Sequence, residues 1–515
     1  MDDKIIVTNK SALVEKYGAA GYARIHRSIV ELVAADATRG IKTRLVCLDS
    51  ESTMRRYAVP AVTSATDPRQ NKRAVDAVFH ATRPDYLMLL GAVDVIPHQD
   101  IRNPAFSAGD DDDVFASGDL PYACEAGYSR DVAKFKAPSR VVGRLPDLTG
   151  AKNPAYLLSV LAAATRFRSR PAADYAAYFG LSTASWAKST GQSLDNIFGN
   201  SAAMRTSPRS GPGFSKAQLA PLSHFINCHG GLSDPCFYGE ENKEHDPDQP
   251  VSMSSRRLAK KIRRGTVVAA ECCYGAELYD SVTLSLPLPI SQQYLLQGAC
   301  GFFGSSTIAY GPAAGNGSAD LITQYFLLQV LEGASLGRAA LAARQQFVQQ
   351  AGELDPMDLK TLAQFNLLGD PSLHPASVTS ATGIPKGTDA ESARRSMRKL
   401  RRARLQDTAL FLEVTKPTAT RLARSTRRSA TVRRALSNIA RSVGRRDGHG
   451  FTAFDVQVPP GTGVRTAKAA GVATRYYVEV FRRRGTSRDQ RGTRVAAVAR
   501  EVSGRIVGYR IYREK

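Results

Sequence analysis

The sequence predicts an α/β protein in which an open, mostly parallel β-sheet is flanked by helices and followed by a small basic β-rich or α+β module. In the first hundred residues, short apolar runs alternate with segments of helical periodicity, and the same alternation resumes near residue 221. Residues 451–515 show period-two patterns instead, which are typical of a β-rich unit. With 515 residues, of which 43% are hydrophobic, the chain can bury more than one core.

The elements of the first part follow in order from these patterns. Apolar runs predict strands at residues 4–8, 43–48, 86–96 and 140–144. Helical periodicity predicts helices at residues 11–35, 71–81 and 154–168. Residues 182–213 are rich in Ser, Gly, Asn and Pro and are expected to form a surface loop or weakly ordered connector.

The remaining elements belong to a second α/β set and to the final module. The second set has predicted strands at residues 224–228, 266–271 and 300–305, helices at 252–263, 291–297, 319–331 and 336–351, and a closing segment at 362–368. In the final module, β patterns occur at residues 452–458, 475–481, 495–502 and 505–512.

The net charge of +23 is confined to one region of the chain. Residues 381–515 hold 32 Lys and Arg against 10 Asp and Glu, a balance of +22, which leaves +1 for residues 1–380. A nucleic-acid interpretation therefore applies only to the basic region. We predict an N-terminal α/β subdomain (1–150), a helical or loop connector (151–220), a second α/β subdomain (221–375), a basic helical linker (376–450) and a small basic β-rich module (451–515).

The chain carries no pattern typical of a secreted or membrane-spanning protein. The first residues contain two acids and no apolar signal segment, and the seven cysteines do not suggest a disulfide framework. Residues 281–319 are free of charge but contain Pro, Gly and many polar residues, as a buried core would rather than a membrane span. We expect a cytoplasmic protein with reduced thiols.

Two turns that follow apolar strands carry the residues best suited to chemistry. One is Asn227-Cys228-His229-Gly230-Gly231, and the other is Glu271-Cys272-Cys273-Tyr274-Gly275. Because ligands bind at the carboxyl ends of strands in open α/β sheets, both turns are expected to face one substrate. A thiol, an imidazole and backbone N–H donors are the groups that acyl transfer needs.

These turns resemble the catalytic turns of caspase-like clan CD cysteine peptidases, and the chain is most similar to the gingipain-like C25 peptidases. Four further segments support the resemblance, which runs in order from about residue 4 to 375: 85–91 with 95–97, 119–122, 141–146 and 365–371. It implies a caspase-like sheet, with residues 221–375 as the catalytic subdomain. It also implies a cysteine endopeptidase acting on protein or peptide substrates.

The resemblance implies roles for individual residues. Cys273 is the expected nucleophile, with Cys272 as the alternative, and His229 is the expected general acid/base. The backbone N–H groups of Gly230 and Cys273 are expected to bind the oxyanion. Asp119 matches the acid in the substrate pocket of relatives that cleave after Arg, so cleavage after Arg, and less surely after Lys, is expected. The residues expected to line the same pocket are Ser305, Ser306 and Tyr310.

No cofactor is expected to be required, and no spacing predicts a metal site such as zinc. Ca²⁺ stabilises relatives of the family, which makes Asp110–Asp113 and the loop at residues 240–246 candidates, although neither has regular ligand spacing. Solvated acidic loops are the favoured interpretation of both.

Two alternatives concern the basic region. The chain could be a caspase-like interaction or scaffold protein whose basic region binds nucleic acid or another anionic partner, although no nucleic-acid motif is recognisable. Alternatively, the basic region regulates the peptidase by binding a partner or by self-processing, since Arg401-Arg402-Ala403-Arg404 and Arg427-Arg428-Ser429 would suit a pocket for Arg.

Overall fold

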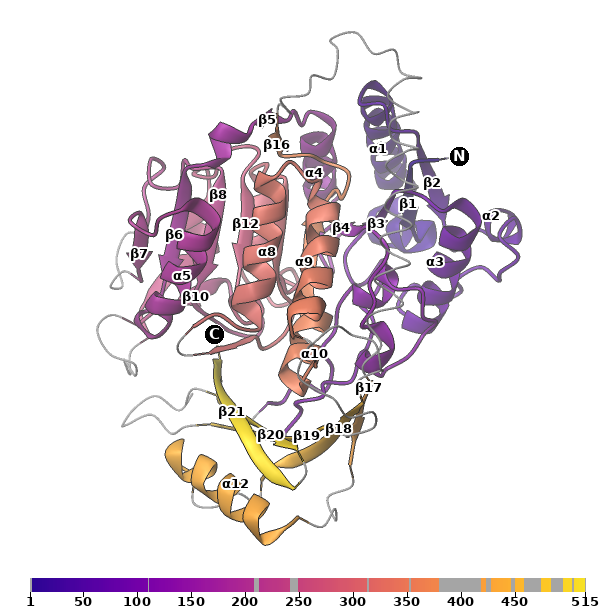
Figure 1. Cartoon of the computed structure of the whole chain (residues 1–515). Coiled ribbons are helices and arrows are strands. Elements are labelled where there is room, and N and C mark those ends of the chain that lie inside the picture. Colours follow the sequence, from indigo (N-terminus) through magenta and orange to yellow (C-terminus); the bar gives the residue numbers. More distant parts are fainter. Residues whose placement is uncertain are drawn as a thin grey trace.

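The computed structural model describes residues 2–109, 111–207, 213–240, 249–312, 315–351, 353–378, 418–422, 428–445, 450–457, 474–482, 494–502 and 504–514. Ten strands form one sheet in the order β2-β1-β3-β4-β15-β13-β12-β8-β6-β7 (Figure 1). Their bounds are β1 (Lys4–Thr8), β2 (Thr43–Cys47), β3 (Tyr86–Leu90), β4 (Val142–Leu145), β6 (Tyr178–Ser182), β7 (Met204–Thr206), β8 (Ser223–Asn227), β12 (Val267–Ala270), β13 (Gly301–Ser305) and β15 (Phe365–Gly369).

This sheet consists of two parallel blocks that meet in one antiparallel pair. β13 and β15 run in opposite directions, with Phe303 opposite Leu367. The strands on either side of that pair are parallel to their neighbours within each block. The central strands are buried along their whole length, as expected for a sheet with both faces covered. The predicted mostly parallel α/β sheet is thus confirmed.

Helices pack on the sheet in two groups. In Figure 1, α5 (Ala187–Phe198), α8 (Ala319–Leu331) and α9 (Leu336–Ala351) lie in front of the sheet, and α10 (Pro356–Gln364) follows α9. The second group includes α1 (Lys10–Thr38), α4 (Ala155–Thr165) and α7 (Ile290–Leu296), in which α4 contacts both other helices. The remaining helices are α2 (Glu51–Arg55), α3 (Pro68–Thr82), α6 (Ser255–Leu258) and the 3₁₀ turns η1 (Leu120–Ala123), η2 (Val132–Phe135), η3 (Ala172–Tyr175) and η4 (Ala184–Trp186).

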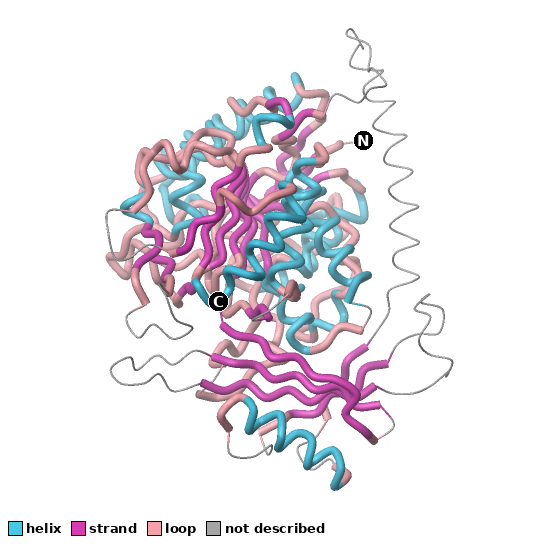
Figure 2. The backbone as a smooth tube through the Cα atoms, turned by 60° about the vertical axis from the view of Figure 1, so that its left-hand side comes forward, coloured by secondary structure: helices cyan, strands magenta, loops and turns pink. Residues whose placement is uncertain are grey.

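A second large sheet forms the C-terminal module, in the order β14-β21-β20-β19-β18-β17. Figure 2 shows it below the main sheet, with α12 (Ala430–Ser442) on its far side. Its strands are β14 (Tyr310–Pro312), β17 (Thr418–Arg421), β18 (Thr452–Gln457), β19 (Thr474–Arg482), β20 (Arg494–Val502) and β21 (Arg505–Glu514). The β patterns predicted in residues 451–515 correspond to β18–β21. The first strand, β14, comes from the α/β body rather than from the module.

Small sheets complete the fold. One contains β9 (His229–Gly230), β10 (Cys236–Tyr238) and β11 (Val251–Ser254), and the other pairs β5 (Arg170–Pro171) with β16 (Ala376–Ser377).

Three local expectations need correction. The strand expected at 86–96 ends at Leu90, because Gly91 turns the chain with a φ of 125°. The loop expected at 182–213 contains α5, whose buried Leu194 and Ile197 outweigh its polar composition. The helix expected at 252–263 is shorter, because β11 takes up its first residues.

The predicted subdomains 1–150 and 221–375 share the ten-stranded sheet. The predicted connector joins them and also contributes β6 and β7 to its edge. Most of the predicted linker at residues 376–450 lies outside the described residues, apart from β16, β17 and α12.

Candidate active site

The two turns singled out by sequence lie against each other. β8 and β12 are parallel neighbours with Ile226 opposite Ala270, so both strands end at the same edge of the sheet. A Cβ atom placed on Gly230 would lie only 1.9 Å from the carbonyl oxygen of Cys273. Only glycine therefore fits where the chain after His229 crosses the cysteine turn.

Cys273 is completely buried, and its thiol is held by one backbone residue. Its Sγ accepts a hydrogen bond from the N–H of Ala309 (3.3 Å) and donates to the carbonyl oxygen of the same residue (3.4 Å). Burial, followed by the negative charge of Glu514, raises the pKa of the thiol well above its ordinary value. In this state the sulfur is a protonated thiol, not an exposed thiolate.

The turn at Cys272–Gly275 has an unusual backbone conformation and leaves the N–H of Cys273 unpaired among the described residues. Tyr274 has a φ of 54°, which a side-chain-bearing residue rarely adopts, and is held there by its N–H bond to Thr307 (3.0 Å). The N–H of Cys273 donates to no other described residue, as an oxyanion donor requires.

His229 is positioned by an acid that follows it in a hairpin. Its Nε2 lies 3.1 Å from Glu240 Oε1, and its ring packs edge-on against Trp186 with centroids 4.7 Å apart. Glu240 is itself buried and also accepts the N–H of Ser185 (3.2 Å). With Nε2–H donated to Glu240, Nδ1 is the ring nitrogen left for proton transfer.

Cys272 and Cys273 point to different neighbours. The Cys272 Sγ lies 4.0 Å from the carbonyl oxygen of Ile226 in β8, and burial raises the pKa of this thiol well above its ordinary value. Cys273 instead faces the loop before β14. This orientation suits a core role for Cys272, and the choice of Cys273 as nucleophile stays a prediction.

Three of the expected pocket residues lie on or beside that same loop: Ser305 ends β13, Ser306 follows it and Tyr310 begins β14. Tyr310 is buried and its hydroxyl donates to Asp111 (3.0 Å). Ser305 and Ser306 use their hydroxyls within the fold, on the carbonyl oxygens of Thr307 (2.8 Å) and Gln364 (3.2 Å). Tyr310 is the one of the three that directly follows Ala309, the residue in contact with the Cys273 thiol.

Asp119 is engaged elsewhere by the chain itself. Its carboxylate accepts two hydrogen bonds from the buried guanidinium of Arg144, at 2.9 and 2.5 Å. Burial opposes ionisation, but the charges of Arg144 and then His98 outweigh it and hold the pKa of Asp119 below its ordinary value. A substrate side chain would have to compete with Arg144 for this carboxylate, so the pocket role of Asp119 stays a prediction.

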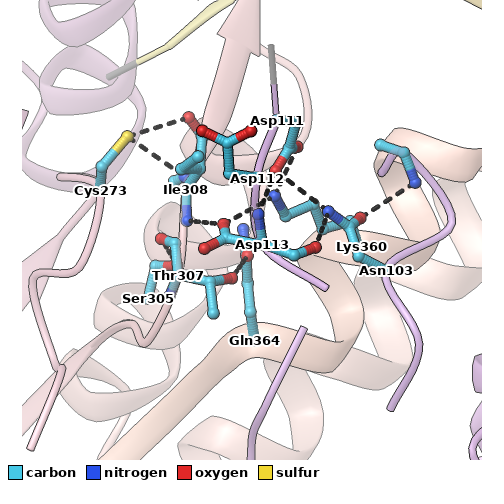
Figure 3. A network of polar contacts seen from close by, with 12 residues as sticks. Asn103, Asp111, Asp112, Asp113, Cys273, Ser305, Thr307, Ile308, Lys360 and Gln364 are labelled. Atoms are coloured by element: carbon cyan, nitrogen blue, oxygen red, sulfur yellow. Dashed lines mark hydrogen bonds and ion pairs between the residues drawn. The ribbon is translucent and has the colours of Figure 1, made fainter. Parts of the chain in front are cut away.

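A different acidic segment, Asp111–Asp113, lies beside the Cys273 loop, which is the loop before β14 that contacts the Cys273 thiol (Figure 3). Asp113 accepts the N–H of Ile308 (2.8 Å) and the hydroxyl of Tyr274 (2.8 Å). The buried Lys360 of α10 binds Asp111 at 2.7 Å and Asp113 at 3.2 Å. The side chain of Asp112, between them, remains 57% exposed.

Metal binding by these acids has no support in the described part of the chain. No group of three His, Cys, Asp or Glu residues there could hold a metal ion. Asp110 and residues 241–248, which include most of the second Ca²⁺ candidate, lie outside the described residues. No helix among the described residues is long and apolar enough to span a membrane.

Sequence reasoning missed Lys360 and considered Glu240 and Asp112 only as members of candidate Ca²⁺ loops. The signal for Glu240 was the hairpin: β9 and β10 pair antiparallel with His229 opposite Tyr238, which returns the chain to the histidine. No local signal marks Lys360, because α10 is brought beside the acids only by the packing of distant elements.

Comparison with known proteins finds a peptidase family that matches the part of the chain containing Cys273. Residues 245–376 match the model of peptidase family C25, which bears out the C25 resemblance for this part of the chain. No curated protein matches the chain.

Two solved structures are similar at low identity. One, "Structure of Protease", is 13% identical, covers 99% of this chain and 97% of its own, and has a TM-score of 0.46. The other is the Saccharomyces cerevisiae separase–securin complex, at 12% identity, with 56% and 16% coverage and a TM-score of 0.25.

Proposed function

We propose that this chain, which carries a C25 peptidase domain, is a cysteine endopeptidase that uses Cys273 as nucleophile and His229 as general acid/base. The observation that carries the proposal is the contact of Gly230 with the carbonyl of Cys273, because it brings the two turns together. Thiol, imidazole and backbone N–H groups are then available at one edge of the sheet.

The reaction assigns one step to each group. Cys273 Sγ attacks the scissile carbonyl carbon while the N–H groups of Cys273 and Gly230 hold the oxyanion. The C–N bond breaks, and the leaving amine takes a proton through His229. Water then attacks the thioester, giving the free acid and restoring the thiol.

Glu240 is a positioning residue in this scheme. It holds Nε2 of His229 and so keeps the ring orientation and tautomer that proton transfer needs. Glu240→Gln retains an acceptor without the charge, and we expect it to lower kcat more than it raises KM. Glu240→Ala should be worse, and equal kcat in all three proteins would contradict the role.

Cleavage after a basic residue is the proposed specificity, supported by the acids beside the Cys273 loop. Lys360 already binds Asp111 and Asp113, whereas Asp112 is half exposed and, among the described residues, is paired only with Arg482 (3.8 Å) and Arg494 (3.6 Å) of the C-terminal module. We therefore propose Asp112 as the principal pocket acid, in place of the Asp119 expected from sequence.

Cleavage-site profiling on a peptide library tests activity and specificity together. The assay compares wild type, Cys273→Ala, Cys272→Ala and Asp112→Asn at high enzyme concentration, with and without Ca²⁺, in reductant. We expect cleavage after Arg or Lys that is lost in Cys273→Ala, retained in Cys272→Ala and less selective in Asp112→Asn. Absence of Cys273-dependent cleavage, both here and in the loosened variant described below, would sink the proposal.

A second function of the module has one supporting observation. The outer face of α12 exposes Arg433, Arg434 and Arg441, which would suit an anionic partner such as nucleic acid. Salt-dependent gel shifts with the full chain carrying Cys273→Ala would detect it, and an unchanged shift in the triple Ala variant of these arginines would remove the assignment.

A further inference from the structure

The C-terminal module is joined to the α/β body at the candidate active site. β21 pairs antiparallel with β14, placing Glu514 opposite Tyr310, Arg513 opposite Gly311 and Tyr512 opposite Pro312. β14 begins directly after Ala309, whose backbone holds the Cys273 thiol. One edge of β14, the strand that follows the residue in contact with the nucleophile, is therefore already occupied by β21.

The C-terminal end of β21 carries two charged residues, Arg513 and Glu514. Among the charged groups, the carboxylate of Glu514 contributes most to raising the pKa of the Cys273 thiol. Its neighbour Arg513 lies within range of the charge of Glu240, the residue that holds His229. The C-terminal end of β21 is therefore within electrostatic range of Cys273 and of Glu240.

A basic side chain of the module reaches the proposed pocket acid. Arg494 of β20 binds Glu514 through Nη1 (2.8 Å), and its Nη2 lies 3.6 Å from Asp112. Its own N–H also donates to Glu514 (3.0 Å). An arginine is therefore held where the proposed specificity would place the arginine of a substrate.

Packing holds the module in this position. Strand alternation gives the sheet two faces, and one packs against α12. The other joins the core of the α/β body through these buried residues: Phe454, Val456, Tyr476, Val478, Val480, Ala496, Val498 and Tyr512. Hydroxyl groups on this face reach body carboxylates, Tyr476 to Glu353 (3.2 Å) and Tyr512 to Asp355 (3.4 Å).

The edge of β14 has the properties of a peptide-binding edge. An exposed strand can add an extended peptide through main-chain hydrogen bonds, with alternate side chains selected by pockets. Here β21 provides that extended strand, and Cys273 has no exposed surface while it is in place.

We propose that β21, together with Arg494, is an internal occupant of the substrate site, which must separate from β14 before a peptide can bind and be cleaved. This inference rests on the proposed function for the identity of the site. The incoming peptide would pair with β14, and its basic side chain would replace Arg494 at Asp112. The basic module is on this view an inhibitory segment rather than only a docking appendage.

The test loosens the occupant in the full chain and measures access to the thiol. Tyr512→Ala removes a buried anchor of β21, and Arg494→Ala removes the pocket contact. The matched control is Val507→Ala on the same strand, whose side chain is 58% exposed. N-ethylmaleimide labelling of Cys273 is followed by peptide mass spectrometry, alongside peptide cleavage.

We expect Cys273 labelling and cleavage to rise at least tenfold in both loosened variants and to stay at the wild-type rate in Val507→Ala. Labelling of Cys300, which is buried far from this strand pair, must not rise, because its exposure would report general unfolding. Equal Cys273 labelling in all these proteins would overturn the proposal.

A locked variant keeps the test decisive if the loosened variants fold poorly. Gly311 and Arg513 face each other across β14 and β21, and opposed positions in antiparallel strands suit a disulfide. The double variant Gly311→Cys/Arg513→Cys should show neither labelling nor cleavage when oxidised and should recover both on reduction. Labelling of the oxidised form at the wild-type rate would contradict the proposal.

The two readouts separate the two proposals. If labelling rises on loosening but no variant cleaves peptides, β21 is an occupant and the peptidase function fails. If cleavage depends on Cys273 but is equal in the loosened and locked forms, the function holds and the occupancy of the substrate site fails.

Discussion

Replacing Asp119 by Ala tests whether this acid is part of the fold or of the substrate pocket. Asp119 and Arg144 are almost completely buried and share two hydrogen bonds, at 2.9 and 2.5 Å. The variant leaves the guanidinium buried with only carbonyl partners, at Gly91 (2.9 Å) and Ile96 (2.7 Å). The unpaired charge of Arg144 should then account for most of the loss in unfolding free energy.

The expected magnitude follows from burial. Removing one partner of a buried ion pair costs about 3–5 kcal/mol, because the remaining charge keeps its desolvation penalty. The exposed pair of Arg83 and Glu125 provides the control, since Glu125→Ala should cost less than about 1 kcal/mol. The double variant Asp119→Leu/Arg144→Met should recover much of the loss, because no charge remains buried.

Urea unfolding at neutral pH measures these free energies. Since the pKa of Asp119 lies below 3.8 in the folded protein, its stabilising contribution is present above pH 3.8 and is lost as the pH falls through the folded pKa. A loss below about 1 kcal/mol, comparable with Glu125→Ala, would refute the reasoning from burial. Unchanged preference for basic residues in Asp119→Ala would further assign the residue to the fold.

Three further predictions concern the surroundings of the site. Gly230→Ala should abolish peptide cleavage and lower the unfolding free energy by at least ~1 kcal/mol, because a Cβ would overlap the Cys273 carbonyl; an active variant of wild-type stability would contradict this. Burial raises the pKa of Glu277 from 4.5 to about 7, so the wild type should lose up to ~3 kcal/mol of unfolding free energy as the pH rises between these values. Glu277→Gln carries no such charge and should become more stable relative to the wild type over the same range. A difference in stability between the two proteins that does not change with pH would contradict this. Lys360→Met leaves the buried Asp111 and the partly buried Asp113 without their cation and should lower the melting temperature more than Glu125→Ala does; equally small decreases in both variants would argue against the charge pairing.

Local patterns predicted most of the fold. α8 and α9 lie at their predicted residues, and β1 and β18–β21 closely follow the runs that predicted them. A helix or strand that buries one face needs apolar residues at its own period, so the spacing of these residues in the sequence identifies the element. Errors occurred where short-range composition opposed packing. In α5, polar residues surround two apolar side chains that the core nevertheless buries.

The sequence by itself determined where the two turns that carry His229 and Cys273 lie. Each turn follows a buried strand, and neighbouring parallel strands end at the same edge of the sheet. Only the tertiary structure decided what surrounds them. It assigned Asp119 to Arg144, brought Glu240 to His229 and laid β21 along β14. The physical reason is that strand and helix patterns depend on neighbours a few residues apart, whereas ion pairs and strand edges are chosen between segments far apart in the chain, where several carboxylates and several arginines compete for the same partners.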